Sequence, residues 1–81
     1  MIEVRFFGTA RLNLNMKYLE LDAKSVSELL KKIEIEANVP PKFARNYLIY
    51  VNEVNIDKLK RFRTKLNDGD KIMILSPSSG G

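Results

Sequence analysis

Apolar and polar residues alternate along two short segments near the start of the chain. In "IEVRFF", Ile2, Val4 and Phe6 fall on one side of an extended backbone, with charged residues between them. In "KYLELD", Leu19 and Leu21 alternate with polar neighbours in the same way. A period of two is typical of half-buried strands. With the polar, glycine-opened segment 8–15 between them, the two runs predict an antiparallel hairpin joined by a turn.

The period then changes from two to that of a helix. Ser25, followed three residues later by Glu28, forms the sequence pattern of a capping box. The apolar residues that follow recur at helical spacing along one face: Val26, Leu29, Leu30, Ile33 and Ala37. Ile35 lies off this stripe, and we expect it to be half exposed. The pattern predicts one helix over residues 25–37.

The second half of the chain has the composition of strands separated by turns. Pro40 and Pro41 end the helix, because proline cannot continue it. "YLIYV" is rich in aromatic and β-branched residues and predicts a strand, and "VNI" predicts a shorter one. "NDGD" predicts a tight turn in which Gly69 adopts positive φ. "KIMIL" is apolar on both faces, which predicts a strand at the centre of a sheet.

This order of elements predicts an α+β fold, with one main helix packed on a mixed sheet of four or five strands. Eighty-one residues make one domain. The predicted core consists of apolar residues from the helix and from four of the five predicted strands: Val4, Phe6, Leu19, Leu21, Val26, Leu29, Leu30, Ile33, Leu48, Ile72 and Ile74.

The composition narrows the chemistry that the chain can perform. The sequence contains no cysteine and no histidine, so it offers neither a thiol nucleophile nor a cysteine-ligated metal site, and it lacks the commonest general base. This double absence argues against self-contained catalysis and predicts no metal site. The first apolar run contains both an acid and a base, unlike a signal peptide. With no apolar stretch of membrane-spanning length, we expect a soluble, cytoplasmic protein.

Four segments together resemble a known family. "MIEVRFFGTAR", "SVSELLKKI", "YVNEVNI" and "LNDGDKIMILSPSSGG" are similar to the MoaD/ThiS-type ubiquitin-like sulfur carriers, and most similar to the small subunit of molybdopterin synthase. The resemblance covers nearly the whole chain, and its most specific part is the "DGD" turn, the strand after it and the terminal Gly-Gly. It implies a β-grasp domain over residues 1–75 and a flexible tail over residues 76–81.

The resemblance also implies a mechanism. The carboxylate of Gly81 would be adenylated with ATP on a ubiquitin-activating-enzyme-like adenylyltransferase, and sulfur would then displace AMP to give a thiocarboxylate. A second partner, the large subunit of molybdopterin synthase, would use that sulfur. Gly80 would let the backbone pass through a narrow channel. The protein itself would be a carrier without a bound cofactor, not an enzyme.

Four further residues match family positions at partner interfaces. Phe7 would be a docking aromatic on the exposed face of the sheet, or alternatively a residue beneath a covering loop. Arg11 matches an arginine that meets partners near the tail, with a solvated turn residue as the alternative. Leu75 would be an apolar interface residue or part of the core. Pro77 is the residue that matches in a tail otherwise more polar than the family pattern.

Several functions share these features. A carrier for thiamine or for tRNA thiolation has the same chemistry with other partners, and a ubiquitin-like modifier would join Gly81 to lysines of other proteins. The basic run of residues 58–65, which encloses Leu59 and Phe62, could bind RNA phosphates, dock on an acidic activating enzyme or form a solvated surface. The sequence favours protein partners over nucleic acid and gives no indication of a membrane partner.

Overall fold

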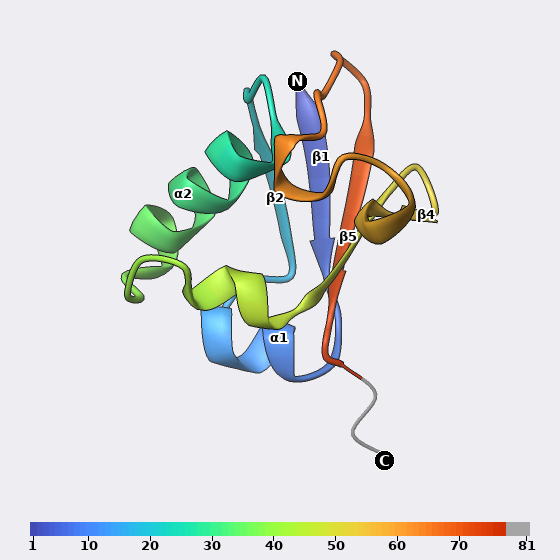
Figure 1. Ribbon diagram of the computed structural model, residues 1–81. Coiled ribbons are helices and arrows are strands. Elements are labelled where there is room, and N and C mark those ends of the chain that lie inside the picture. Colours follow the sequence, from blue (N-terminus) through green and yellow to red (C-terminus); the bar gives the residue numbers. More distant parts are fainter. Residues whose placement is uncertain (78–81) are drawn as a thin grey trace.

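The computed structural model describes residues 1–77. They form a five-stranded sheet with helices packed on one side (Figure 1). The strand order is β2-β1-β5-β3-β4, with β1 and β5 parallel and all other neighbours antiparallel. The elements follow the chain as β1 (Ile2–Phe6), α1 (Gly8–Leu14), β2 (Tyr18–Leu21), α2 (Val26–Ala37), η1 (Phe43–Asn46), β3 (Leu48–Val51), β4 (Val54–Asn55), η2 (Ile56–Lys58), η3 (Arg61–Arg63) and β5 (Lys71–Leu75).

The two central strands carry the apolar centre of the molecule. Val4 of β1 is in register with Ile72 of β5, and Phe6 is in register with Ile74. All four side chains are buried. The prediction that "KIMIL" forms a central strand is therefore confirmed, because a strand with neighbours on both edges and a helix over one face must be largely apolar.

Helix α2 covers the inner face of the sheet. Its N-cap residue is Ser25, whose Oγ accepts a hydrogen bond from the Glu28 N–H at 3.2 Å. The helix ends where Asn38 adopts a left-handed conformation with φ 59°. Val26, Leu29, Leu30 and Ile33 of the apolar stripe are buried as predicted and Ala37 is partly buried, whereas Ile35 is 80% exposed. The predicted helix is thus confirmed to within one residue of its bounds.

The predicted turn between the first two strands is wrong, because residues 8–14 form helix α1. The antiparallel pairing itself is confirmed, with Val4 opposite Leu19. The segment reads as polar because only Ala10 and Leu14 of this helix are buried. These two residues are four positions apart, so one helical face reaches the core and closes it at the end of the sheet where β5 finishes (Figure 1).

The predicted core is wrong at one position of β3. Ile49 and Val51 are buried, whereas Leu48 is half buried and lies opposite Leu75 on the other face of the sheet. "YLIYV" is apolar throughout, so alternation could not specify which residues face the helix. Leu19 and Leu21 are partly buried and pack against the core.

No helix within residues 1–77 combines the length and apolar character needed to cross a lipid bilayer.

Truncating a residue of the α2 stripe tests the core. Leu30 is buried, so Leu30→Ala should lower the free energy of unfolding by about 2–5 kcal/mol, measured by denaturant titration. The matched control is Ile35→Ala on the same helix, which should change it by less than about 0.5 kcal/mol because the side chain is exposed. Similar losses for both variants would show that this stripe does not face the core.

Candidate functional site

The chain leaves the sheet after Leu75, and its next residue is bound to the start of α1. The backbone N–H of Thr9 donates a hydrogen bond to Ser76 Oγ at 2.5 Å, and Thr9 Oγ1 donates a second one at 2.7 Å. The Phe7 N–H donates to the Ile74 carbonyl at 2.9 Å, which extends the pairing of β1 and β5. These contacts fix the position of Ser76 at the end of the sheet.

Gly8 makes this close approach possible. Its φ is +61°, a conformation that L side chains rarely adopt, and a Cβ at this position would overlap the Ser76 hydroxyl oxygen. We call Gly8, Thr9 and Ser76 the tail anchor. Sequence reasoning missed all three residues, because the hydrogen bonds join positions 67 residues apart.

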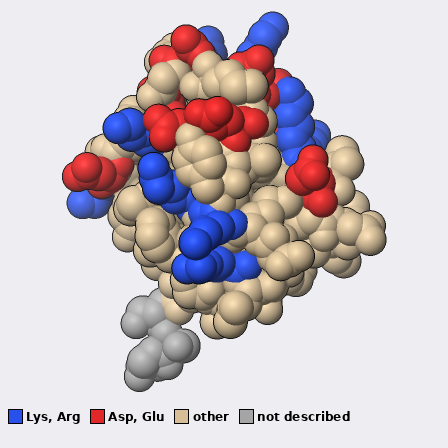
Figure 2. All heavy atoms as spheres, turned by 180° about the vertical axis from the view of Figure 1, so that it is seen from behind, with Lys and Arg blue, Asp and Glu red and all other residues tan. Residues whose placement is uncertain are grey.

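An apolar row lies beside the tail anchor on the outer face of the sheet, away from α2. Leu48 pairs with Leu75. Phe7 comes next to Leu75, because the parallel register puts the preceding residue, Phe6, beside Ile74. Phe7 is 41% exposed, and both leucines are partly exposed. Seen from behind, the lower part of the molecule near the last described residues is mostly uncharged (Figure 2). We call Phe7, Leu48 and Leu75 the apolar row.

The charged side chains of β1 and β2 on this face interact with one another. The guanidinium carbon of Arg5 lies 5.0 Å from the centre of the Tyr18 ring, and Arg5 is 3.9 Å from the carboxylate of Glu3. The Tyr18 hydroxyl donates to Glu20 Oε2 at 2.7 Å, and this bond is the main reason that the pKa of Tyr18 is raised to about 12. The polar groups of β1 and β2 are thus paired with one another. The apolar row, by contrast, is the part of this face with side chains available for a partner.

The structure brings together three of the four residues that the sequence predicted to contact partner proteins. Phe7, Leu75 and Pro77 lie at the end of the sheet where β5 finishes. Arg11 is exposed on the adjoining helix α1, not in a turn. Leu48 joins this group without having been predicted, since its face was assigned wrongly. Gly80 and Gly81 lie outside the described residues.

Adding one methyl group at Gly8 or at Gly69 tests the tail anchor. Both glycines have positive φ, but nothing lies within 4 Å of a Cβ at Gly69. Gly69→Ala should therefore cost about 1–2 kcal/mol of stability through backbone strain alone. Gly8→Ala should cost about 1 kcal/mol more, because the new Cβ displaces Ser76 from its hydrogen bonds.

Ser76→Ala provides the second arm of this experiment, since it removes the oxygen that the Cβ would meet. In a chain that already carries Ser76→Ala, Gly8→Ala should lower the stability by no more than Gly69→Ala does. Thermal unfolding measures both losses. Equal costs for the two glycine variants in the unmodified chain would contradict the anchor.

Comparison with known proteins identifies the family of the chain. The model of the ThiS family matches residues 4–81. The solution structure of small archaeal modifier protein 1 from Methanosarcina acetivorans is similar with a TM-score of 0.80 and 25% identity, over 99% of this chain and 95% of that one. A chain of the complex of subunits 1 and 2 of molybdopterin-converting factor from Helicobacter pylori is similar with a TM-score of 0.70 and 30% identity. The match covers 99% of this chain and 97% of that one.

The fold recurs in the BexX/CysO complex from Amycolatopsis orientalis, with a TM-score of 0.75 and 22% identity over 100% of both chains. A search of curated protein sequences returned no match. The predicted β-grasp fold and the resemblance to the MoaD/ThiS-type carriers are both confirmed. The chain belongs to the ThiS family, whose small ubiquitin-like carriers are not catalysts themselves and work with partner enzymes.

Proposed function

We propose that this protein is a sulfur carrier that donates sulfur in molybdopterin biosynthesis, acting in the cytoplasm from a thiocarboxylate at Gly81. The observation that carries the proposal is the family match over residues 4–81, which includes the Gly-Gly pair. The choice of pathway is supported by the 30% identity to a chain of molybdopterin-converting factor. The tail anchor supports it as well, because it holds Ser76, the residue after β5, in a fixed position at the surface of the domain.

The proposed chemistry uses only the carboxylate of Gly81. One of its oxygens attacks the α-phosphorus of ATP on a partner adenylyltransferase, which forms the acyl-adenylate and releases pyrophosphate. Hydrosulfide, supplied on the partner side, then attacks the acyl carbon; the bond to AMP breaks, and loss of the S–H proton leaves the thiocarboxylate. ATP is thus a substrate of the partner, and the carrier needs no resident cofactor and no histidine or cysteine of its own.

The length of the tail and the surface beside it fit the proposed function. A stretch of six residues spans at most roughly 20 Å when it is extended, so Gly81 could enter an active site in another protein while the domain stays outside. The apolar row beside the tail anchor would dock on the adenylyltransferase and then on the large subunit of molybdopterin synthase. An exposed aromatic beside aliphatic side chains, with the exposed Arg11 on the adjoining helix α1, has the composition of an interface core with a polar rim.

A second candidate function is a protein modifier attached through Gly81 to lysine amines. The similarity to small archaeal modifier protein 1, at a TM-score of 0.80 over nearly the whole of both chains, favours it. The two functions share the acyl-adenylate and differ in the acceptor, which is a sulfur donor in one case and an amine in the other. Incubating the protein with both acceptors, a sulfur donor and a protein that carries lysine amines, distinguishes the two functions. Mass measurement then shows whether a thiocarboxylate or a conjugate forms.

Deleting Gly81 tests the proposed chemistry. With a cognate adenylyltransferase, ATP and a sulfur donor, intact-mass measurement should show one sulfur in place of one oxygen on the full chain. Removing Gly81 shortens the reach by about 3.3–3.6 Å, which should slow the conversion by about a hundredfold or more. As a control, Ile35→Ala, at an exposed position of α2 outside the proposed interface, should leave the conversion intact. Equal conversion of the truncated and full chains would rule out the carrier chemistry.

A charge in the apolar row tests the docking surface. Phe7→Glu should weaken binding to the adenylyltransferase by about tenfold or more, because an interface core tolerates an unpaired carboxylate poorly. The matched control is Ile35→Glu, which places the same charge on an exposed apolar position of α2 outside the row. Calorimetric titration gives the affinities, and circular dichroism shows whether both variants fold. If the two variants bind equally well, Phe7 does not belong to the interface.

A further inference from the structure

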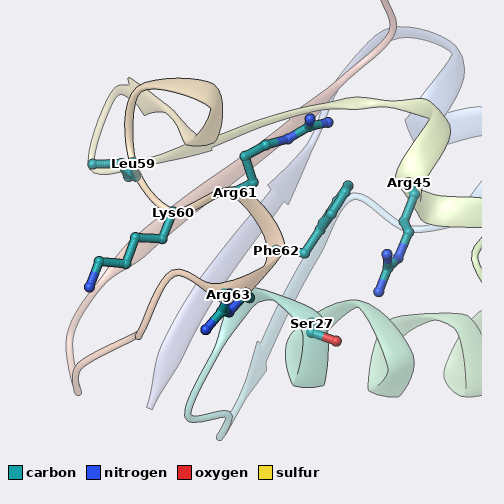
Figure 3. Close-up of a pocket in the computed structure, with 7 residues that line it drawn as sticks. All are labelled: Ser27, Arg45, Leu59, Lys60, Arg61, Phe62 and Arg63. Atoms are coloured by element: carbon teal, nitrogen blue, oxygen red, sulfur yellow. The ribbon is translucent and has the colours of Figure 1, made fainter.

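The basic run between β4 and β5 lines a pocket that the proposed function does not use. The segment folds into η2 and η3, and η3 packs against α2. Together with Arg45 from η1, it lines a cavity of about 820 Å³ (Figure 3). The basic lining residues are Arg45, Lys60, Arg61 and Arg63, and the apolar ones are Leu59 and Phe62.

Two of the arginines are held in place by the aromatic ring. The guanidinium carbon of Arg45 lies 4.3 Å from the centre of the Phe62 ring, and that of Arg61 lies 5.6 Å from it. Phe62 itself is half buried and packs against the core. Stacking restrains these long side chains before any ligand arrives, so less conformational entropy is lost on binding. A stacked guanidinium keeps its N–H groups at the edge, where they suit planar oxyanions.

The positive charge of this pocket is largely uncompensated. Arg61 pairs with Asp57 at 3.4 Å, and within residues 1–77 no ion pair involves Arg45, Lys60 or Arg63. A hollow lined by charges of one sign concentrates the electrostatic field and attracts groups of the opposite sign. The pocket is therefore suited to an anionic ligand.

The apolar part of the lining indicates which anion. Leu59 is 40% exposed beside the cations, and a phosphate backbone would leave this surface uncovered. Arg45 lies over the Phe62 ring (Figure 3), so the ring offers less free face for stacking a nucleic-acid base. Acidic protein segments, by contrast, carry both carboxylates and apolar side chains.

We propose that this pocket is a second docking site, which binds an acidic segment of a partner protein. Carboxylates of the segment pair with Arg45, Lys60 and Arg63, and an apolar side chain of the segment packs on the exposed Leu59. The pocket shares no residue with the apolar row or the tail anchor. Its occupation therefore does not require Gly81, and its failure would leave the carrier chemistry untouched.

A titration followed by NMR tests the site. The ¹⁵N-labelled full chain is titrated with a synthetic glutamate-rich peptide that contains two leucines. The same titration is made with a peptide that has glutamine in place of glutamate, with a single-stranded RNA oligonucleotide and with inorganic phosphate. The acidic peptide should shift the amide signals of residues 45 and 59–63 saturably, and its affinity should fall as ionic strength rises. The glutamine peptide should bind at least about tenfold more weakly.

Charge-reversal variants show whether the pocket residues are responsible. Arg63→Glu should weaken the acidic peptide by about tenfold or more. The matched control Lys17→Glu makes the same change at an exposed lysine outside the pocket, and it should change the affinity by less than about twofold. Arg45→Lys keeps the charge but loses the planar stack, so it should weaken binding by an intermediate factor.

Three outcomes would overturn the proposal. The first is unchanged affinity in Arg63→Glu, with its fold confirmed by circular dichroism. The second is tighter binding of RNA or phosphate than of the acidic peptide at the same ionic strength, and the third is a set of shifts that maps elsewhere. A chain that lacks Gly80 and Gly81 should bind the peptide as well as the full chain does, which separates this site from the tail chemistry.

Discussion

The parallel pairing of β1 with β5 is the interaction on which the rest of the structure depends. It places the first strand of the chain beside the last one at the centre of the sheet, with Val4 in register with Ile72. Both side chains are completely buried, so the pairing and the hydrophobic core stabilise each other. The same register brings Phe7 and the start of α1 to the point where β5 ends, and the tail anchor exists only because of that neighbourhood.

The two faces of the sheet serve different purposes. The inner face packs against α2 and α1, and the buried side chains of the sheet and of both helices meet there. The outer face is divided along its length: charged residues of β1 and β2 pair with one another, and the apolar row lies at the end near Ser76. This arrangement leaves an uncharged surface where the proposed partners would need to meet both the domain and its tail.

In the proposed function, the anchored Ser76 also limits the entropic cost of placing the tail in a partner's active site. A tail that starts from a fixed position and direction loses less freedom on binding than one that starts from a frayed strand end. The two hydrogen bonds from Thr9 to Ser76 supply that fixed start. The stacked arginines around Phe62 follow the same principle on a different surface, since there too the binding groups are restrained in advance.

The sequence by itself determined the elements whose signals are local. Ser25 and the apolar stripe specify α2, apolar residues on both faces specify β5 as a central strand, and Gly69 marks the turn before it, where φ is +90°. The family, and with it the proposal for Gly81, also came from the sequence, because the motifs are contiguous. Each of these features depends on residues within a few positions of one another.

Only the tertiary structure decided the features that depend on distant neighbours. Helix α1 forms because the core can bury Ala10 and Leu14, although its segment is polar. The face of β3 was set by its register with β5, which puts Ile49 rather than Leu48 inside. The anchor joins Thr9 to Ser76, and the basic pocket joins Arg45 to Phe62. In each case the energy comes from a contact between segments that alternation and capping along the chain do not encode.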